Sequence, residues 1–202
     1  MNLSFRKSFF LFALAAWIAS GELENLAIQA KAEEPAKTFN FEDIDGQDHG
    51  WSPNKKTTTV LVFINIDCPI ANSYHPVLSK LVNDLNDKNV DVVLVQANPH
   101  LTEKQAREHI REYNIHLPVV LDPNQEIAQS VLARVTPEAF IVDKKGLVQY
   151  RGRIDDQYVS FGKKRPKPTR EDLKIAIDEV LAGKPVSERD TKAVGCLIRF
   201  PK

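Results

Sequence analysis

The segment VLVFINIDCPIANSYHP, residues 60–76, reads as a buried strand that runs directly into a helix. Its first residues are apolar and mostly β-branched, which is typical of a strand with both faces covered. The run ends at Asp67, which puts Cys68 at a helix N-cap and Pro69 at the first helical position, where a missing N–H costs nothing. Free backbone N–H groups and the helix dipole favour a thiolate there. We therefore expect Cys68 to be a reactive nucleophile, although a buried cysteine is usually a small core residue.

Predicted strands and helices alternate along the rest of the chain. The strands are expected at residues 39–44, 58–66, 89–95, 118–121, 139–142 and 147–151. The helices are expected at residues 69–85, 102–113, 126–132 and 169–182. Thr102 and Gln105 form a capping box, and residues 169–172 are expected to cap the last helix. This order predicts an α/β domain with a central mixed sheet and helices on both of its faces.

Residues 1–32 have the pattern of a signal peptide. Arg6 and Lys7 precede an uncharged apolar run, and residues 30–32 read AKA, which is an A-x-A cleavage site. The alternative is an uncleaved membrane anchor through residues 8–20, although this run is short for a bilayer span. Both interpretations predict export, to the periplasm or as a secreted protein, into a compartment where disulfides persist.

The length of the chain suits one domain with short extensions. We expect a linker at residues 33–37, a domain at 38–185 and a C-terminal tail at 186–202 that carries the second cysteine, Cys196.

The 27 basic and 27 acidic residues balance, which argues against nucleic-acid binding through bulk charge. Two cysteines are too few for a disulfide scaffold or a cysteine-only metal site, so we expect no metal and no cofactor. The sequence does not predict the oligomeric state.

Several motifs resemble those of one superfamily. Pro76 follows Cys68 at the spacing that thioredoxins have between their first active-site cysteine and a helix-kinking proline. Thr136-Pro137 precedes a predicted strand, as it does in the same proteins. Residues 68–72 read CPIAN and residues 195–200 read GCLIRF. In these motifs the chain resembles the thioredoxin-like superfamily, and within it the exported redoxin or peroxiredoxin-like (AhpC/TSA-type) branch.

This resemblance covers about residues 38–182 and implies a thioredoxin-like fold. It also implies a cis bond between Thr136 and Pro137 that faces Cys68, with a backbone edge presented to an extended substrate. The candidate substrate-binding residues are those of this motif and their neighbours in the expected site: Asn72, Thr136, Pro137 and Glu138.

Two departures from the family pattern leave the reaction open. Ala71 replaces the second cysteine of Cys-x-x-Cys, which excludes dithiol chemistry within one helical turn. Leu61 and Asn65 replace the proline and the threonine of the peroxiredoxin pattern. Thiol–disulfide exchange with a protein partner is the preferred interpretation. The alternative is an antioxidant thiol peroxidase, in which a peroxide oxidises Cys68 to a sulfenic acid.

Cys196 has two competing interpretations. It is either the resolving partner of Cys68 in a redox-active disulfide, or half of a permanent bridge that fixes the tail to the domain. A bridge closing so long a loop is worth about 5 kcal/mol in the chain-entropy model. The permanent bridge corresponds to a third hypothesis of another class, a non-catalytic binding module with a redoxin fold.

For the histidines we expect positions at the surface, and for the basic segments we consider both a structural and a functional interpretation. His75 lies about two helical turns after Cys68, too far along the axis for direct contact, and is expected to be solvated. The other histidines lack metal-ligand spacing and are expected at the surface: His49, His100, His109 and His116. Residues 151–156 and 163–168 form a cationic region, which is either a solvated loop or a docking surface for an acidic partner.

Overall fold

The computed structural model describes residues 39–51, 57–85 and 88–201. The predicted leader at 1–32 and the predicted linker at 33–37 lie outside the described residues. Among the helices of the described part, none combines the length and the hydropathy that a membrane crossing requires.

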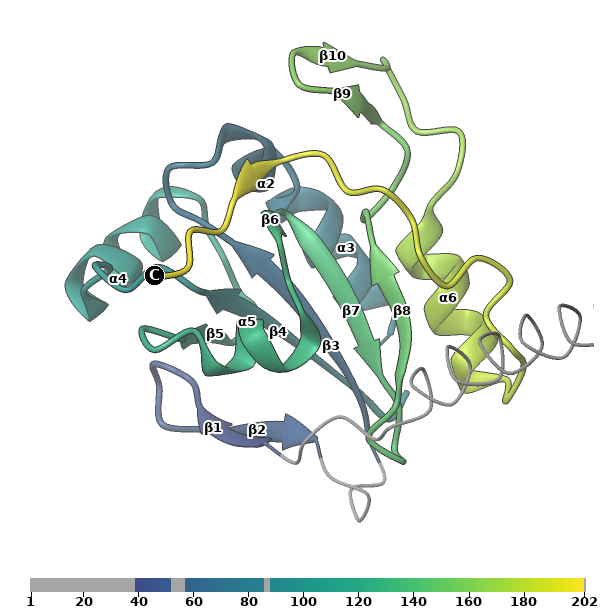
Figure 1. Ribbon diagram of the computed structural model, residues 1–202, viewed down its shortest axis with the longest axis horizontal. Coiled ribbons are helices and arrows are strands. Elements are labelled where there is room, and N and C mark those ends of the chain that lie inside the picture. Colours follow the sequence, from purple (N-terminus) through teal and green to yellow (C-terminus); the bar gives the residue numbers. More distant parts are fainter. Residues whose placement is uncertain (1–38, 52–56, 86–87, 202) are drawn as a thin grey trace, which may run out of the picture. The chain divides into compact units, whose positions relative to one another are not determined.

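A five-stranded mixed sheet forms the centre of the domain (Figure 1). Across the sheet, the strands are β5 (Val119–Leu121), β4 (Val90–Gln96), β3 (Thr58–Ile64), β7 (Glu138–Val142) and β8 (Val148–Gly152). β3 is parallel to β4 and antiparallel to β7, so the sheet mixes both directions. The predicted α/β class with a central mixed sheet is confirmed.

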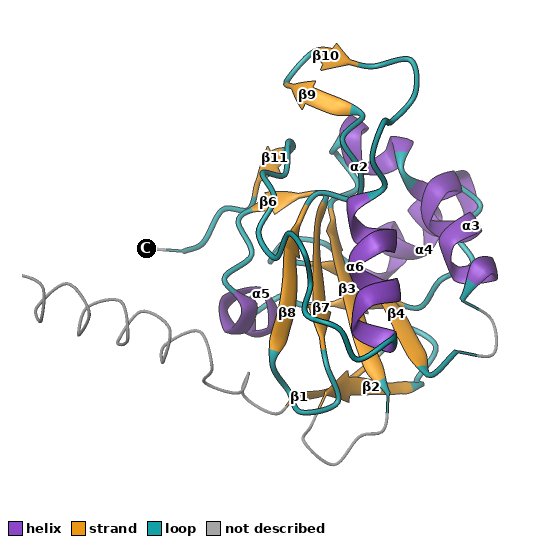
Figure 2. Cartoon of the chain, turned by 90° about the vertical axis from the view of Figure 1, so that its right-hand side faces the viewer, coloured by secondary structure: helices purple, strands orange, loops and turns teal. Residues whose placement is uncertain are grey.

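Helices cover both faces of this sheet (Figure 2). The helices are α2 (Pro69–Ser73), α3 (His75–Asp84), α4 (Glu103–Glu112), α5 (Glu126–Val131) and α6 (Asp172–Leu181). α3 and α6 lie on one face, and α5 lies on the other. Each predicted helix is present, but the first of them is divided in two.

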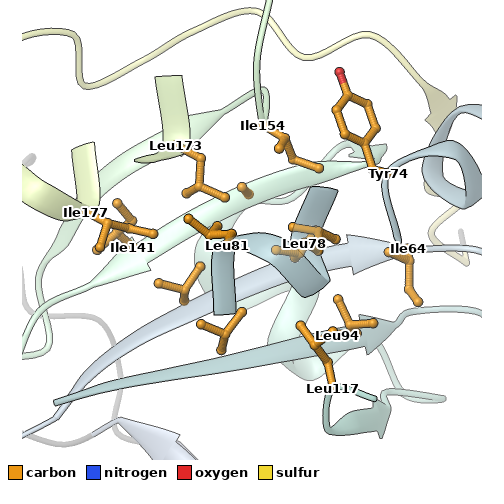
Figure 3. Close-up of a cluster of buried hydrophobic side chains, with 14 of the residues drawn as sticks. Ile64, Tyr74, Leu78, Leu81, Leu94, Leu117, Ile141, Ile154, Leu173 and Ile177 are labelled. Carbon is orange, nitrogen blue, oxygen red and sulfur yellow. The ribbon is translucent and has the colours of Figure 1, made fainter. Parts of the chain in front are cut away.

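Alternate side chains of β3 enter two separate hydrophobic cores, and all of them are buried. Val60, Val62 and Ile64 point to the core under α3 and α6. Leu61 and Phe63 point to the core under α5. Figure 3 shows the first core, in which the following side chains gather: Ile64, Leu78, Leu81, Leu173 and Ile177. Because both cores depend on β3, the position of its C-terminal end is fixed from two sides.

Within the described residues, three short two-stranded ladders lie outside the central sheet. They pair β1 (Phe39–Glu42) with β2 (Asp48–Trp51), β6 (Val135–Thr136) with β11 (Cys196–Leu197), and β9 (Tyr158–Ser160) with β10 (Lys163–Lys164). Of these strands, the sequence predicted only β1. The β6–β11 ladder ties the C-terminal tail to the residues just before Pro137.

The helix starts agree with the sequence at two places and differ at one. Cys68 is the N-cap of α2 with an extended backbone, and Thr102 and Gln105 form the predicted capping box of α4. The predicted cap of the last helix is wrong, because α6 begins after Glu171 without a side-chain cap. Thr169 instead hydrogen-bonds to the carboxylate of Asp156 through its backbone N–H and its hydroxyl.

The helix predicted at 69–85 is interrupted at Tyr74, which ends α2 and begins α3. Pro76 explains the interruption, because it donates no hydrogen bond and its ring clashes with the carbonyl four residues earlier in a continuous helix. The short α2 therefore carries Cys68 at its start and is oriented independently of α3.

Candidate functional site

Cys68 is the residue around which the site is built. It follows β3 in a tight turn, in which its N–H donates to the carbonyl of Asn65 at 3.0 Å. Its own carbonyl accepts the N–H of Asn72 at 2.9 Å, the first hydrogen bond of α2. The side chain has no exposed surface, and its Sγ donates to the carbonyl oxygen of Thr136 at 2.9 Å. The sulfur therefore meets a backbone edge rather than open solvent.

Thr136 and Pro137 supply that backbone edge. The peptide bond between them is cis, as the resemblance implied, and Thr136 is buried. The buried Glu138 side chain supports this segment, since its Oε2 accepts the N–H groups of Arg134 at 2.7 Å and Val135 at 3.3 Å. Glu138 thus lies behind β6, where it holds the strand in place.

The C-terminal tail occupies the free edge of β6. Cys196 is paired with Thr136 in the antiparallel ladder, and the N–H of Ile198 donates to the carbonyl of Arg134 at 2.9 Å. Gly195 passes so close that a Cβ there would lie 2.0 Å from the carbonyl oxygen of Thr136. Only glycine allows the tail to approach this edge, so the Gly-Cys sequence is a packing requirement as well as a motif.

Gln125 fixes the end of the tail, and no sequence pattern pointed to it. Its buried Nε2 donates to the carbonyl of Arg199 at 2.8 Å and to the carbonyl of Ala97 at 2.9 Å. The residue stands just before α5 with a left-handed φ of 57°, a conformation that is uncommon for glutamine. The clamp joins the tail to the loop after β4.

The two cysteines are free thiols, and their pKa values are shifted in opposite directions. Burial raises the pKa of Cys68, but the neighbouring Cys196 thiol and the nearby backbone N–H groups of Ala71 and Cys196 bring it below its ordinary value. Burial and the bond to Cys68 raise the pKa of Cys196 to about 11. Cys68 is therefore the better thiolate, and Cys196 keeps its proton.

Asn72 lies one turn after Cys68, with both polar ends of its side chain in use. Its Nδ2 donates to the carbonyl of Ile66 at 2.9 Å, and its Oδ1 contacts Nε2 of His109 at 2.9 Å. These bonds fix the turn that presents Cys68 and link it to α4. A role for Asn72 in substrate binding stays a prediction.

The expected exposure of three histidines is wrong. His75 and His109 are buried between α3 and α4, where their rings lie 5.4 Å apart beside Tyr113. His49 is also buried, with its ring nitrogens 3.0 Å from the carboxylates of Asp43 and Asp91. The helical packing of α3 against α4 buries His75, a tertiary contact that its spacing from Cys68 did not reveal.

Both ring nitrogens of His75 lack a hydrogen-bond partner within the described residues. Burial and the neighbouring His109 lower the pKa of His75 to about 4, and burial also lowers that of His109. The pair is therefore neutral near pH 7. In the part of the chain that the structure describes, no three His, Cys, Asp or Glu side chains gather as metal ligands.

Thus the structure brings both cysteines to Thr136, Cys68 through the hydrogen bond of its sulfur and Cys196 through the β6–β11 ladder, with Pro137 next in the same segment. Asn72 and Glu138 border this group, and their polar groups are bonded within the protein. The arrangement can form a thiolate at Cys68 and offers a second thiol to the same sulfur.

Comparison with known proteins identifies a family and a fold. The model of the AhpC/TSA family matches residues 32–151. The thiol-disulfide oxidoreductase ResA of Bacillus cereus is 23% identical over 113 residues, which is 56% of this chain and 64% of ResA. The chain spans just under two thirds of the length of the curated relatives that it matches first.

Solved structures share the fold. A hypothetical protein of Sinorhizobium meliloti 1021 superposes with a TM-score of 0.70 at 26% identity, covering 83% of this chain and 93% of that one. The thioredoxin domain of a thiol-disulfide oxidoreductase of Bacteroides vulgatus has a TM-score of 0.54 at 17% identity, covering 73% and 96%. The second likeness concerns the fold alone, and that fold is thioredoxin-like.

Proposed function

Because this chain belongs to the AhpC/TSA family, we propose that it is an exported thiol–disulfide oxidoreductase with Cys68 as nucleophile and Cys196 as resolving cysteine. One observation carries the proposal. The Cys68 sulfur, whose pKa is lowered, is hydrogen-bonded to the carbonyl of Thr136, and Cys196, whose pKa is raised, pairs with the same residue in the β6–β11 ladder. The name of the relative ResA supports the same class of reaction.

The reaction has two exchange steps. The Cys68 thiolate attacks one sulfur of a partner's disulfide, and the partner's other sulfur leaves as a thiolate that takes up a proton. Cys196 then loses its proton and attacks the Cys68 sulfur, which releases the partner's second thiol. Two electrons pass from the protein to the partner, and the protein is left with a disulfide between Cys68 and Cys196. An external thiol reductant must restore it.

Access to Cys68 requires the tail to move. The sulfur has no exposed surface, and β11 covers the backbone edge of β6. A partner that reaches the sulfur replaces residues 196–197 along that edge. In this proposal Thr136 and Pro137 bind the partner's backbone, while Asn72 and Glu138 hold the two sides of the site in position.

The N-terminal signal pattern supports the proposed export, and export supplies the oxidising compartment in which such partners occur. The partner is a protein disulfide or thiol. No metal or cofactor takes part in the proposed steps.

Peroxide reduction is the second candidate, favoured by the AhpC/TSA match and by the enclosed sulfur, which suits a small oxidant. In that reaction the peroxide oxidises Cys68 to a sulfenic acid, and Cys196 condenses with it to form a disulfide and water.

Paired assays of insulin reduction and hydrogen peroxide consumption test these proposals on the wild type, Cys68→Ser and Cys196→Ser. We expect insulin reduction in the wild type, loss in Cys68→Ser, and a stalled mixed disulfide in Cys196→Ser. Peroxide consumption without insulin reduction would favour the peroxidase. Inactivity of every form, together with a disulfide that resists glutathione, would identify a structural bridge.

A further inference from the structure

The β9–β10 hairpin projects from the end of the domain where the site lies. In Figures 1 and 2 it extends away from the sheet, at the same end as α2, β6 and β11. Its strands pair Ser160 with Lys163 and Tyr158 with Lys164. The hairpin pairs with no strand of the central sheet.

The root of the hairpin is attached to the helix that begins at Cys68. The Tyr158 hydroxyl lies 2.9 Å from Oγ of Ser73 in α2, and its ring packs against Tyr74 with centroids 5.7 Å apart. The Tyr74 hydroxyl in turn donates to Asp155 at 2.5 Å. These contacts hold the hairpin at a set position relative to α2, as a docking element requires.

The tip of the hairpin presents apolar side chains to solvent. Phe161 is 69% exposed and Val159 is 44% exposed. Burying these two side chains against a partner would be favourable, as for other exposed apolar side chains.

The hairpin and the loop after it are positively charged, although the acidic and basic residues of the whole chain balance. Residues 157–170 contain five basic residues and no acidic one: Lys163, Lys164, Arg165, Lys167 and Arg170. Arg165 is paired with Asp156, and Arg170 is paired with Asp172 and Glu188. Among the described residues, no carboxylate pairs with the other three, and Lys164 lies 5.1 Å over the Tyr158 ring. In the rest of the predicted cationic region, Arg151 is paired with Asp190 and Arg153 with Asp172. The basic side chains without an acidic partner therefore lie on the hairpin and in the loop that follows it.

We propose that the β9–β10 hairpin, with Phe161 and Val159 at its tip and Lys163, Lys164 and Lys167 beside them, docks the partner protein through an acidic surface next to the partner's disulfide. This inference rests on the proposed function and adds the charge of the substrate to it. A protein partner suits the site better than an anionic membrane. The hairpin is bound to α2 beside Cys68, so a molecule docked on it lies next to that sulfur. This position is useful only for a partner that carries a reacting sulfur of its own. Basic clusters of this kind steer oppositely charged molecules and select against like-charged ones.

Two disulfide-bridged peptides of equal length test the proposal, one with aspartates and one with lysines around the bridge. The readout is the ratio of their kcat/KM values with the reduced full chain at low salt. We expect the acidic peptide to react about tenfold faster or more, and the ratio to fall toward one at high salt. The charge-reversed variant K163E/K164E/K167E should invert the ratio. The control K144E/K145E reverses two exposed lysines in the β7–β8 turn at the opposite end of β7, and it should keep the wild-type ratio.

Equal rates for the two peptides in the wild type would overturn the docking proposal, as would the same ratio in the wild type and the charge-reversed variant. Binding of the wild type to phosphatidylglycerol vesicles, lost in that variant while the peptide ratio stays near one, would assign the arm to a membrane instead. Failure to reduce both peptides and also hydroxyethyl disulfide would overturn the proposed function and the docking proposal with it.

Discussion

The thiol of Cys68 donates a hydrogen bond to the backbone carbonyl of Thr136 across 2.9 Å. In this state the Cys68 sulfur is bonded to the same residue that pairs with Cys196 in the β6–β11 ladder. When Cys68 ionises, the sulfur can no longer donate to the carbonyl and depends on donors, of which the Cys196 thiol is one. The tail therefore places the Cys196 thiol beside a sulfur that has no exposed surface, and this neighbouring thiol helps to lower the pKa of Cys68.

Gly195→Ala should loosen the tail, because the new Cβ would lie 2.0 Å from the Thr136 carbonyl oxygen. Overpacking of this kind costs about 1–3 kcal/mol, which corresponds to an open fraction raised about 5- to 150-fold. Alkylation of Cys68 by iodoacetamide, followed by mass spectrometry, should accelerate accordingly. The exposed tail residue Lys192, changed to Ala, is the control and should react as the wild type does. An unchanged rate in Gly195→Ala would show that the tail does not limit access.

Cys196→Ala should raise the pKa of Cys68, since it removes one donor to the thiolate while the sulfur keeps part of its burial. The ultraviolet absorbance of the thiolate, followed against pH, measures the effect. Cys196→Ser retains a hydroxyl donor and should shift the curve less. A lower pKa of Cys68 in the alanine variant would mean that burial by the tail outweighs its hydrogen bond.

Glu138→Ala should lower the free energy of unfolding by about 1–3 kcal/mol, because it leaves the N–H groups of Arg134 and Val135 without an acceptor. Glu138→Gln keeps a carbonyl oxygen at the same position and should lose less. Urea denaturation of both variants gives the comparison. Equal stability of the alanine variant and the wild type would contradict the supporting role given to Glu138.

His75 should make the protein less stable in mild acid. Burial and His109 lower its pKa from 6.5 to about 4, so between these values the unfolded chain binds a proton that the folded chain does not. The free energy of unfolding should therefore fall as pH drops through this window, by up to about 3 kcal/mol, and flatten below it.

His75→Phe should remove most of this fall, with a remainder from His109, whose pKa is also lowered. Urea denaturation at several pH values measures it. The same change at the exposed His100 is the control and should leave the pH dependence intact. A wild-type stability that is flat between these pH values would contradict the lowered pKa of His75.

The sequence predicted the parts of the site that depend on residues close together in the chain. The passage from β3 into α2 at Cys68 follows from a continuous apolar run, an N-cap position and a following proline. The β6–β11 ladder could not be predicted, because two-residue strands have no periodicity and their pairing joins distant segments. The Gln125 clamp and the burial of His75 also depend on contacts between elements far apart in the chain. Local patterns thus located Cys68 at the junction of β3 and α2, while tertiary packing determined what surrounds it.

Trapping the mixed disulfide tests the central claim most directly. Reduced Cys196→Ser is mixed with a disulfide-bridged peptide, quenched with acid and mapped by mass spectrometry, beside the wild type and Cys68→Ser. We expect the peptide attached to Cys68 in Cys196→Ser, a disulfide between Cys68 and Cys196 with free peptide thiols in the wild type, and no adduct in Cys68→Ser. An adduct on Cys196 in Cys68→Ser that forms as fast, or the absence of any adduct on Cys68, would contradict the assignment of Cys68 as the nucleophile.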